Sequence, residues 1–161
     1  MKNQKGFSLI ELLIVVVIIG IIAAIAIPNL LAARRSANEG SAVSAVRTLH
    51  GAQMTYASTY GNGSYAPAIT NLGGTTGLVD STLAGGAKSG YNFASAGAAG
   101  SATAPPSFFV SAAAASIGTV TATGTRRFCT LTDGVMKASS ATAATAYDAA
   151  TCGSETGLLA P

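Results

Sequence analysis

The chain has 161 residues, the length of one ordinary domain, and a net charge of +3. Charged residues make up 9% of it, against about 25% in a typical globular protein, and 49% of it is apolar. This composition excludes a highly charged disordered chain and disfavours a typical cytosolic enzyme. So weak a basic balance gives no indication of nucleic-acid binding.

A long uncharged segment dominates the N-terminal third of the chain. Residues 12–33 contain no charged side chain, and residues 12–27 are apolar throughout except for Gly20. A helix of about 20 apolar residues spans a bilayer, so we expect this segment to insert into a membrane. Lys2 and Lys5 precede it, which favours an N-terminus on the cytoplasmic side.

An ordinary secretory signal peptide is the alternative interpretation of this segment. Cleavage after Ala26 would leave a mature chain that begins at Ile27. Two features disfavour it. Glu11 stands at the head of the apolar run, where a carboxylate at mid-bilayer costs roughly 2.5–3.5 kcal/mol, and the helical pattern continues past residue 27. Ser8 and Glu11 also fit a capping box, in which the two side chains would hold the start of a helix.

The N-terminal residues resemble the class III signal sequence of type IV pilins and pseudopilins. The likeness is dense over residues 5 to about 35, where KGFSLIEL at residues 5–12 is followed by the apolar run and by Pro28-Asn29-Leu30. It implies that prepilin peptidase cuts between Gly6 and Phe7 and that Phe7 becomes N-methylated. Residues 1–6 would then be a short leader peptide of the type IVa kind.

The same resemblance implies assembly roles for Glu11 and Pro28. In the family, the carboxylate at the position of Glu11 pairs with the N-terminal amine of a neighbouring subunit, and an ammonium and a carboxylate stabilise each other in low dielectric. Pro28 removes a helical hydrogen bond and should kink the axis. By resemblance, residues 20–29 can lose helical structure when subunits pack in a filament. A passive bend near a membrane boundary is the alternative.

One helix is expected over residues 7–60, with residues 7–33 as its membrane or filament core. Beyond the apolar run, side chains at spacings of three and four form a single face: Ala42, Val46, Leu49, Gln53, Tyr56 and Tyr60, with Ala45 and Ala52 beside them. Gln53 is the one polar member of this face. The turn residues Gly61-Asn62-Gly63 should end the helix.

Residues 61–161 are predicted to form a small globular head. Strands are expected at residues 90–95, 107–112, 126–131 and 135–139. A hairpin turn is expected at residues 132–134, a short helical turn at residues 78–84, and either a weak strand or a loop at residues 117–123. The predicted fold class is α+β. A long N-terminal helix, membrane-inserting in its first half, packs against a small antiparallel sheet, as in pilins.

Cys129 and Cys152 are the two cysteines of the chain. In an exported domain two cysteines favour a disulfide, which would stabilise a head with few large apolar residues. The pair also resembles the disulfide-bounded C-terminal region of many pilins. Two free buried thiols and a metal site are the alternatives. A metal site is disfavoured because the single histidine, His50, lies far upstream.

The chain shows no recognisable catalytic or cofactor-binding pattern. One histidine gives no credible Ser-His-Asp set, and the glycine pairs do not lead from a strand into a helix as a phosphate loop requires. His50 is interpreted as a residue of the helix surface or of an interface. We therefore expect no enzyme activity, no cofactor and no metal.

Two groups of charged residues leave alternatives open. Four acidic residues could in principle hold calcium, as in the head of the major type II secretion pseudopilin, but their scatter is more typical of surface and turn positions: Asp80, Asp133, Asp148 and Glu155. The pair Arg126 and Arg127 is expected to protect the edge of a strand, with a ligand-binding patch as the alternative.

The sequence predicts a structural subunit of a type IV pilus. Its expected partners are further copies of the chain in a helical filament, prepilin peptidase and the inner-membrane assembly machinery, with no sequence-specific nucleic acid. The precursor is expected in the inner membrane and the assembled pilus outside the cell. A major pseudopilin of type II secretion is one alternative. A secreted binding protein with an ordinary signal peptide is the other.

Overall fold

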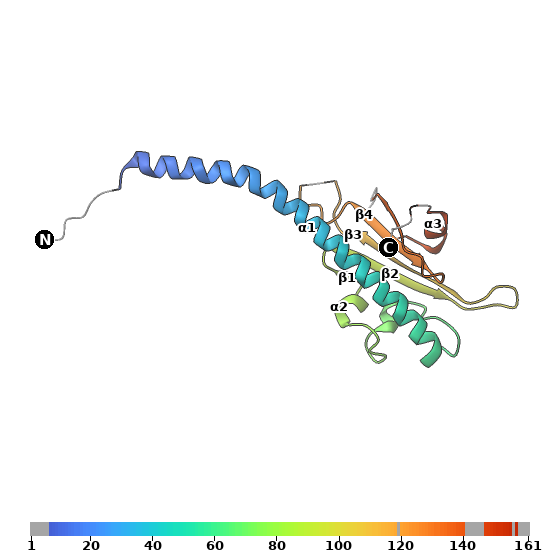
Figure 1. Ribbon diagram of the computed structural model, residues 1–161. Coiled ribbons are helices and arrows are strands. Elements are labelled where there is room, and N and C mark those ends of the chain that lie inside the picture. The colour runs from blue at the N-terminus through green and yellow to red at the C-terminus, as the bar shows by residue number, and fades with distance from the viewer. Residues whose placement is uncertain (1–6, 119, 141–146, 156, 158–161) are drawn as a thin grey trace. The chain divides into compact units, whose positions relative to one another are not determined.

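The computed structural model describes residues 7–118, 120–140, 147–155 and 157 (Figure 1). The helices are α1 (Leu9–Thr59), the 3-10 helix η1 (Ile69–Leu72), α2 (Ser81–Ala84) and α3 (Ala149–Ser154). The strands are β1 (Ala87–Lys88), β2 (Tyr91–Ala98), β3 (Ser107–Ala114), β4 (Arg126–Leu131) and β5 (Lys137–Ser140). The chain divides into two compact units, residues 1–34 and 35–161, so α1 contributes residues to both.

The first unit is the apolar part of α1. The helix begins after Ser8, whose carbonyl accepts hydrogen bonds from the backbone N–H groups of Glu11 and Leu12 at 3.2 and 3.3 Å. Its length and composition are sufficient for a membrane-spanning helix. The predicted capping box is wrong, because no side-chain hydrogen bond joins Ser8 to Glu11 in the described part of the chain. Backbone bonds alone close the first turn.

The second unit contains a five-stranded antiparallel sheet in the order β1-β2-β3-β4-β5. Each strand pairs with its neighbours in sequence, and the long β2–β3 pair runs from Tyr91 opposite Ala114 to Ala98 opposite Ser107. Four strands and the short helix α2 lie where the sequence predicts them. The described residues of the segment 117–123 form a loop rather than a strand. β1, η1 and α3 were not predicted.

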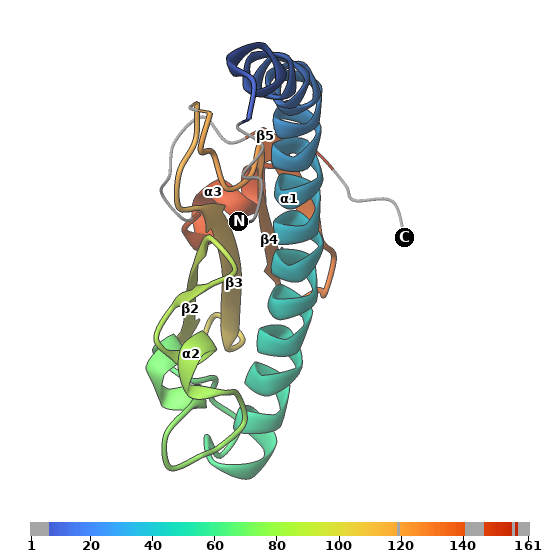
Figure 2. The same ribbon diagram turned by 90° about the vertical axis from the view of Figure 1, so that its left-hand side faces the viewer.

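The core of this unit lies between the C-terminal half of α1 and one face of the sheet (Figure 2). Alternate strand residues point toward the helix, as the two-residue period of a strand requires. From the sheet they are Tyr91, Phe93, Phe108, Val110, Ala112, Ala114 and Phe128; from α1 they are Ala42, Ala45, Val46, Leu49 and Ala52. The fold is therefore the expected α+β arrangement of a long helix on a small antiparallel sheet.

Gln53 is fully buried in this core and satisfies its polar atoms there. Its Nε2 donates to the Ala66 carbonyl at 3.2 Å and to Ser95 Oγ at 2.9 Å, and its Oε1 accepts from the Ala66 N–H at 2.9 Å. A buried amide is stable only when such bonds are made. The single polar residue of the predicted helix face thus fixes the chain after α1 against the sheet.

The opposite face of the sheet carries the smaller cluster of Cys129, Tyr147 and Cys152. Cys129 follows Phe128 along β4 and therefore points away from α1. The disulfide joins β4 to α3, and the Ser111 hydroxyl on β3 donates to the Tyr147 carbonyl at 3.0 Å. The C-terminal segment is held to the sheet by a covalent bond and by polar contacts.

Candidate functional site

The N-terminal unit presents apolar side chains on every side of α1. Phe7 is 70% exposed and Leu9 is 80% exposed. The other large apolar residues from position 10 to position 30 are exposed as well: Ile10, Leu12, Leu13, Ile14, Val15, Val16, Val17, Ile18, Ile19, Ile21, Ile22, Ile25, Ile27 and Leu30. A helix that is apolar all round requires a lipid or protein environment.

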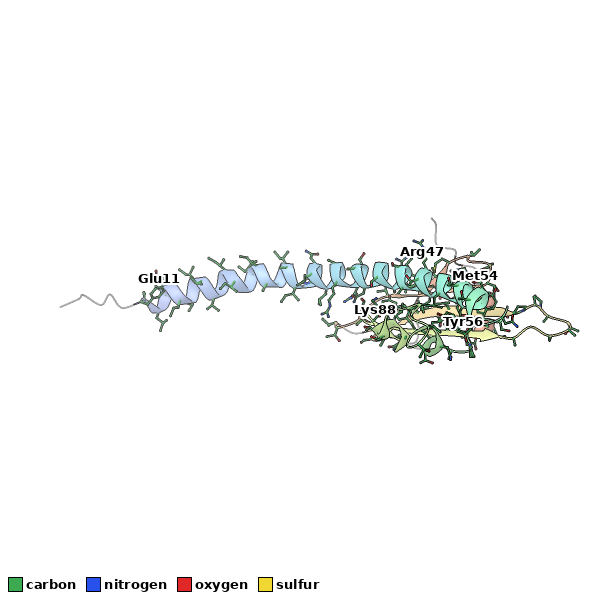
Figure 3. The ribbon with its side chains drawn as sticks, turned by 90° about the horizontal axis from the view of Figure 1, so that it is seen from below. Glu11, Arg47, Met54, Tyr56 and Lys88 are labelled. Carbon is green, nitrogen blue, oxygen red and sulfur yellow. A yellow bond between two sulfur atoms is a disulfide. The ribbon has the colours of Figure 1, made fainter. Side chains whose placement is uncertain are left out.

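Glu11 lies in the first turn of α1, with its side chain exposed (Figure 3). A carboxylate is favourable at this end of a helix, where the unpaired backbone N–H groups give a partial positive charge. Phe7 lies just before the helix, four residues from Glu11 along the chain. Gly6, the residue before the predicted cleavage point, lies outside the described residues.

Pro28 stands inside α1 without interrupting it. Proline has no N–H for the carbonyl four residues before it, so one helical hydrogen bond is missing there. The neighbouring Asn29 donates its Nδ2 to the Ile25 carbonyl at 3.2 Å. A signal peptide cut after Ala26 would divide this continuous helix, which disfavours that alternative.

Glu39 connects α1 to the start of β4, a role that the sequence did not predict. Its Oε1 accepts from the Thr125 N–H and hydroxyl, each at 2.8 Å, and its Oε2 accepts from Arg126 Nε at 2.9 Å. Burial raises the pKa of the Glu39 carboxyl, but these hydrogen bonds outweigh burial and hold the pKa below its usual value. The available signal was its position three residues before Ala42, on the same helix face.

The expected edge-protecting role of Arg126 and Arg127 is wrong. β4 is an inner strand because β5 pairs with it, and both arginines bind acidic side chains. Arg126 pairs with Glu39, while the Arg127 guanidinium lies 4.0 Å from the centroid of the Tyr147 ring and 3.5 Å from Glu155 Oε1. The two adjacent arginines therefore connect β4 to α1 through Glu39 and to the residues after α3 through Glu155.

The predicted disulfide between Cys129 and Cys152 is present. Lys137 supports it by donating Nζ to the carbonyls of Cys152 and Gly153 at 3.1 and 3.3 Å. These bonds place a cation at the C-terminal end of α3, where the helix carries partial negative charge. Covalent and electrostatic contacts thus hold the same short helix.

The four acidic residues considered for calcium have separate structural roles. Asp80 and Asp148 cap α2 and α3 by accepting from the N–H groups of Leu83 and Thr151 at 2.8 and 2.7 Å. Asp133 accepts from the Val135 N–H in the β4–β5 turn, and Glu155 accepts from the Tyr147 hydroxyl at 2.6 Å. Within the described ranges, no three histidine, cysteine or acidic side chains gather as a metal site would require.

The long apolar helix and the antiparallel head together form a pilin-like α+β architecture, and the comparisons with known proteins agree. Residues 1–27 match the family model described as the prokaryotic N-terminal methylation motif. No solved structure matches the chain significantly. The motif and the relatives described next show that the N-terminal segment of this chain is similar to the corresponding segments of type IV pilins and of type II secretion core proteins.

Three relatives illustrate the likeness. The type IV wide pilus major component PilA4 of Thermus thermophilus is 69% identical over 39 residues, 24% of this chain and 30% of that protein. The type II secretion system core protein G of Klebsiella pneumoniae is 38% identical over 56 residues, 35% and 40% of the two chains. The type IV major pilin protein PilA of Myxococcus xanthus is 46% identical over 54 residues, 34% and 24%. The likeness thus spans 40% or less of each of these relatives.

Proposed function

We propose that this chain is the precursor of a type IV pilin, cleaved between Gly6 and Phe7, N-methylated on Phe7 and polymerised into a helical filament. The observation that carries the proposal is the methylation motif leading directly into a helix whose large apolar side chains are exposed from Leu9 to Leu30. These side chains require lipid around the precursor. They require neighbouring helices in the assembled fibre.

Cleavage creates the amine that Glu11 is proposed to bind. The new N-terminus lies at Phe7, four residues before Glu11. A buried carboxylate without a partner is costly, and an ammonium group from an adjacent subunit removes that cost. The pair would therefore set the axial position of each arriving subunit, since only one displacement along the fibre brings the two groups together.

The proposed location differs between the precursor and the assembled filament. The precursor resides in the inner membrane, where prepilin peptidase and the assembly machinery act on it, and the assembled pilus lies outside the cell. The role is structural rather than catalytic. Its named relatives are pilus components and secretion-system core proteins, which supports this assignment.

Substituting Glu11 tests the assembly step separately from processing. Glu11→Gln keeps the size of the side chain and removes its charge, so the variant should be cleaved and methylated but absent from sheared surface filaments. Ser8→Ala is the matched control one turn away, because the Ser8 side chain is exposed and carries no charge. Wild-type amounts of filaments from Glu11→Gln would contradict the pairing.

A major pseudopilin of type II secretion is the second candidate. It is favoured by the core protein G relatives, which match 54–56 residues at 38–41% identity. The two functions differ in their product, a long surface filament or a short assembly confined to the envelope. Recovery of the processed chain only from the cell envelope would support the pseudopilin assignment.

A further inference from the structure

A small cavity in the head, separate from the N-terminal unit, is lined by a basic pair from α1. Arg47 and His50 are three residues apart and so lie on one side of the helix (Figure 3 labels Arg47). Thr130 of β4, Gly134 of the β4–β5 turn and Met136 complete the lining, and the cavity measures about 110 Å³. The proposed pilin function assigns no role to these residues.

His50 contributes a polar atom that has no hydrogen-bond partner among the described residues. Its Nε2 is buried and makes no hydrogen bond within the described structure. The ring is held in place by Phe108, whose centroid lies 5.1 Å away, and its Nε2 and Cε1 face Gly134. A buried nitrogen beside a cavity, without a partner, costs free energy unless something in the cavity binds it.

Arg47 is exposed and adds a positive charge to the lining of this cavity. Arg126 and Arg127 each bind a glutamate, whereas no acidic side chain within the described ranges pairs with Arg47. The acidic residue nearest in sequence to the lining is Asp133, whose Oδ1 accepts from the Val135 N–H at 3.0 Å. The cavity therefore offers hydrogen-bond donors and positive charge.

We propose that Arg47 and His50 bind a compact oxyanion, a phosphate or a carboxylate, in this cavity. The guanidinium supplies a charge-assisted donor and the imidazole Nε2 a second donor in its N–H form. The volume suits such a group and is well below the roughly 300 Å³ of an ordinary small-molecule pocket. The anion comes either from solution or from a carboxylate of a neighbouring copy of this chain.

Because His50 is the only histidine, its ring reports on the site without ambiguity. The full chain in detergent micelles, labelled with ¹⁵N-histidine, is titrated with sodium phosphate and then with sodium acetate, at ionic strength held constant with chloride. We expect a saturable shift of the Nε2 resonance. A shift that grows linearly with phosphate concentration, or an equal shift with chloride alone, would overturn the proposal. The wild-type protein is sufficient for this test.

Variants of Arg47 separate a binding role from general electrostatics. Loss of one charge-assisted hydrogen bond in Arg47→Gln should weaken phosphate binding about tenfold, and Arg47→Lys should restore part of it. Arg34→Gln is the matched control, since it removes the same charge from the other unit of the chain. Equal affinities in Arg47→Gln and Arg34→Gln would contradict the site.

Assembled fibres distinguish the two sources of the anion, and this step alone rests on the proposed pilin function. In phosphate-free buffer, a His50 resonance already at its bound position, and insensitive to phosphate, identifies a carboxylate of a neighbouring subunit. A resonance at its free position that titrates with phosphate identifies an anion from solution. A free resonance in the fibre that phosphate does not move would overturn the site in the assembled state.

Discussion

Glu39 links two segments that lie 86 residues apart in sequence, so its hydrogen bonds should contribute to the stability of the head. Glu39→Gln keeps the size of the side chain but removes the charge that Thr125 and Arg126 bind. We expect the free energy of unfolding at pH 7 to fall by about 1–2 kcal/mol. Urea unfolding of the full chain in detergent, followed by near-UV circular dichroism, measures this difference.

The contribution of Glu39 should also depend on pH. Its pKa in the folded state lies below the unfolded value, so the stabilisation is complete above about pH 4.3 and is lost as pH falls through the folded pKa. The difference in stability between wild type and Glu39→Gln should therefore shrink below that pH. A difference that stays constant down to pH 2.5 or so would contradict this assignment of the carboxylate.

Gln53 should tolerate apolar replacement poorly despite its position in an apolar face. Gln53→Leu would leave the buried Ala66 N–H without its partner. The Ala66 carbonyl would keep the Gly97 N–H, and the Ser95 hydroxyl would keep the Phe109 carbonyl. Unpaired buried groups cost about 1–3 kcal/mol each, so we expect the unfolding midpoint in urea to fall clearly. Thr48→Leu on the exposed face of α1 is the control and should leave the midpoint nearly unchanged.

At the level of elements, replacing glycine by alanine should change the stability of the head in opposite directions at two positions. A Cβ at Gly124 would overlap the buried Tyr91 ring and hydroxyl, so Gly124→Ala should destabilise the head by about 1–3 kcal/mol. Gly51 lies exposed within α1 with nothing within 4 Å of such a Cβ, so Gly51→Ala should stabilise the head by roughly 0.5–1 kcal/mol. Thermal unfolding of both variants measures these changes. If both substitutions raised or both lowered the unfolding temperature, the result would contradict the structure.

The disulfide should determine whether α3 stays on the sheet. The double substitution of Cys129 and Cys152 by serine removes a cross-link over a loop of moderate length and should cost about 3 kcal/mol. The backbone amides of α3 should then exchange with solvent much faster than those of β3. Reduction of the wild-type protein should reproduce the effect, and unchanged exchange in α3 would show that polar contacts suffice.

The sequence allowed the larger elements to be predicted because their signals are local. The helix period, the alternation along the strands and the turn residues near positions 61–63 and 132–134 are all set by neighbours in the chain. β1, η1 and α3 are only two to six residues long and have too few positions to show a period. Glu39 was not predicted because its partners, Thr125 and Arg126, lie far along the chain at the start of β4, and an isolated helical glutamate normally indicates a solvated face.

At the scale of the whole molecule, the two units have different proposed roles: the N-terminal unit serves processing and assembly, and the second unit forms the folded head. The polar contacts of Glu39 inside the head join residues far apart in sequence and were identified from the structure. The residues of the N-terminal unit form a contiguous motif that was readable from the sequence. In the first unit α1 is apolar on every side and its side chains are exposed. In the second unit α1 carries one apolar face, and that face forms part of the core of the head.

The mass of the subunit in sheared surface filaments tests the central claim most directly. The account predicts a chain of residues 7–161 that begins with N-methylated Phe7 and contains one disulfide, recovered from the fibres. Intact mass spectrometry before and after reduction, together with sequencing of the N-terminus, measures all three properties. A soluble chain that begins at Ile27, with none of the protein in filaments, would contradict the account.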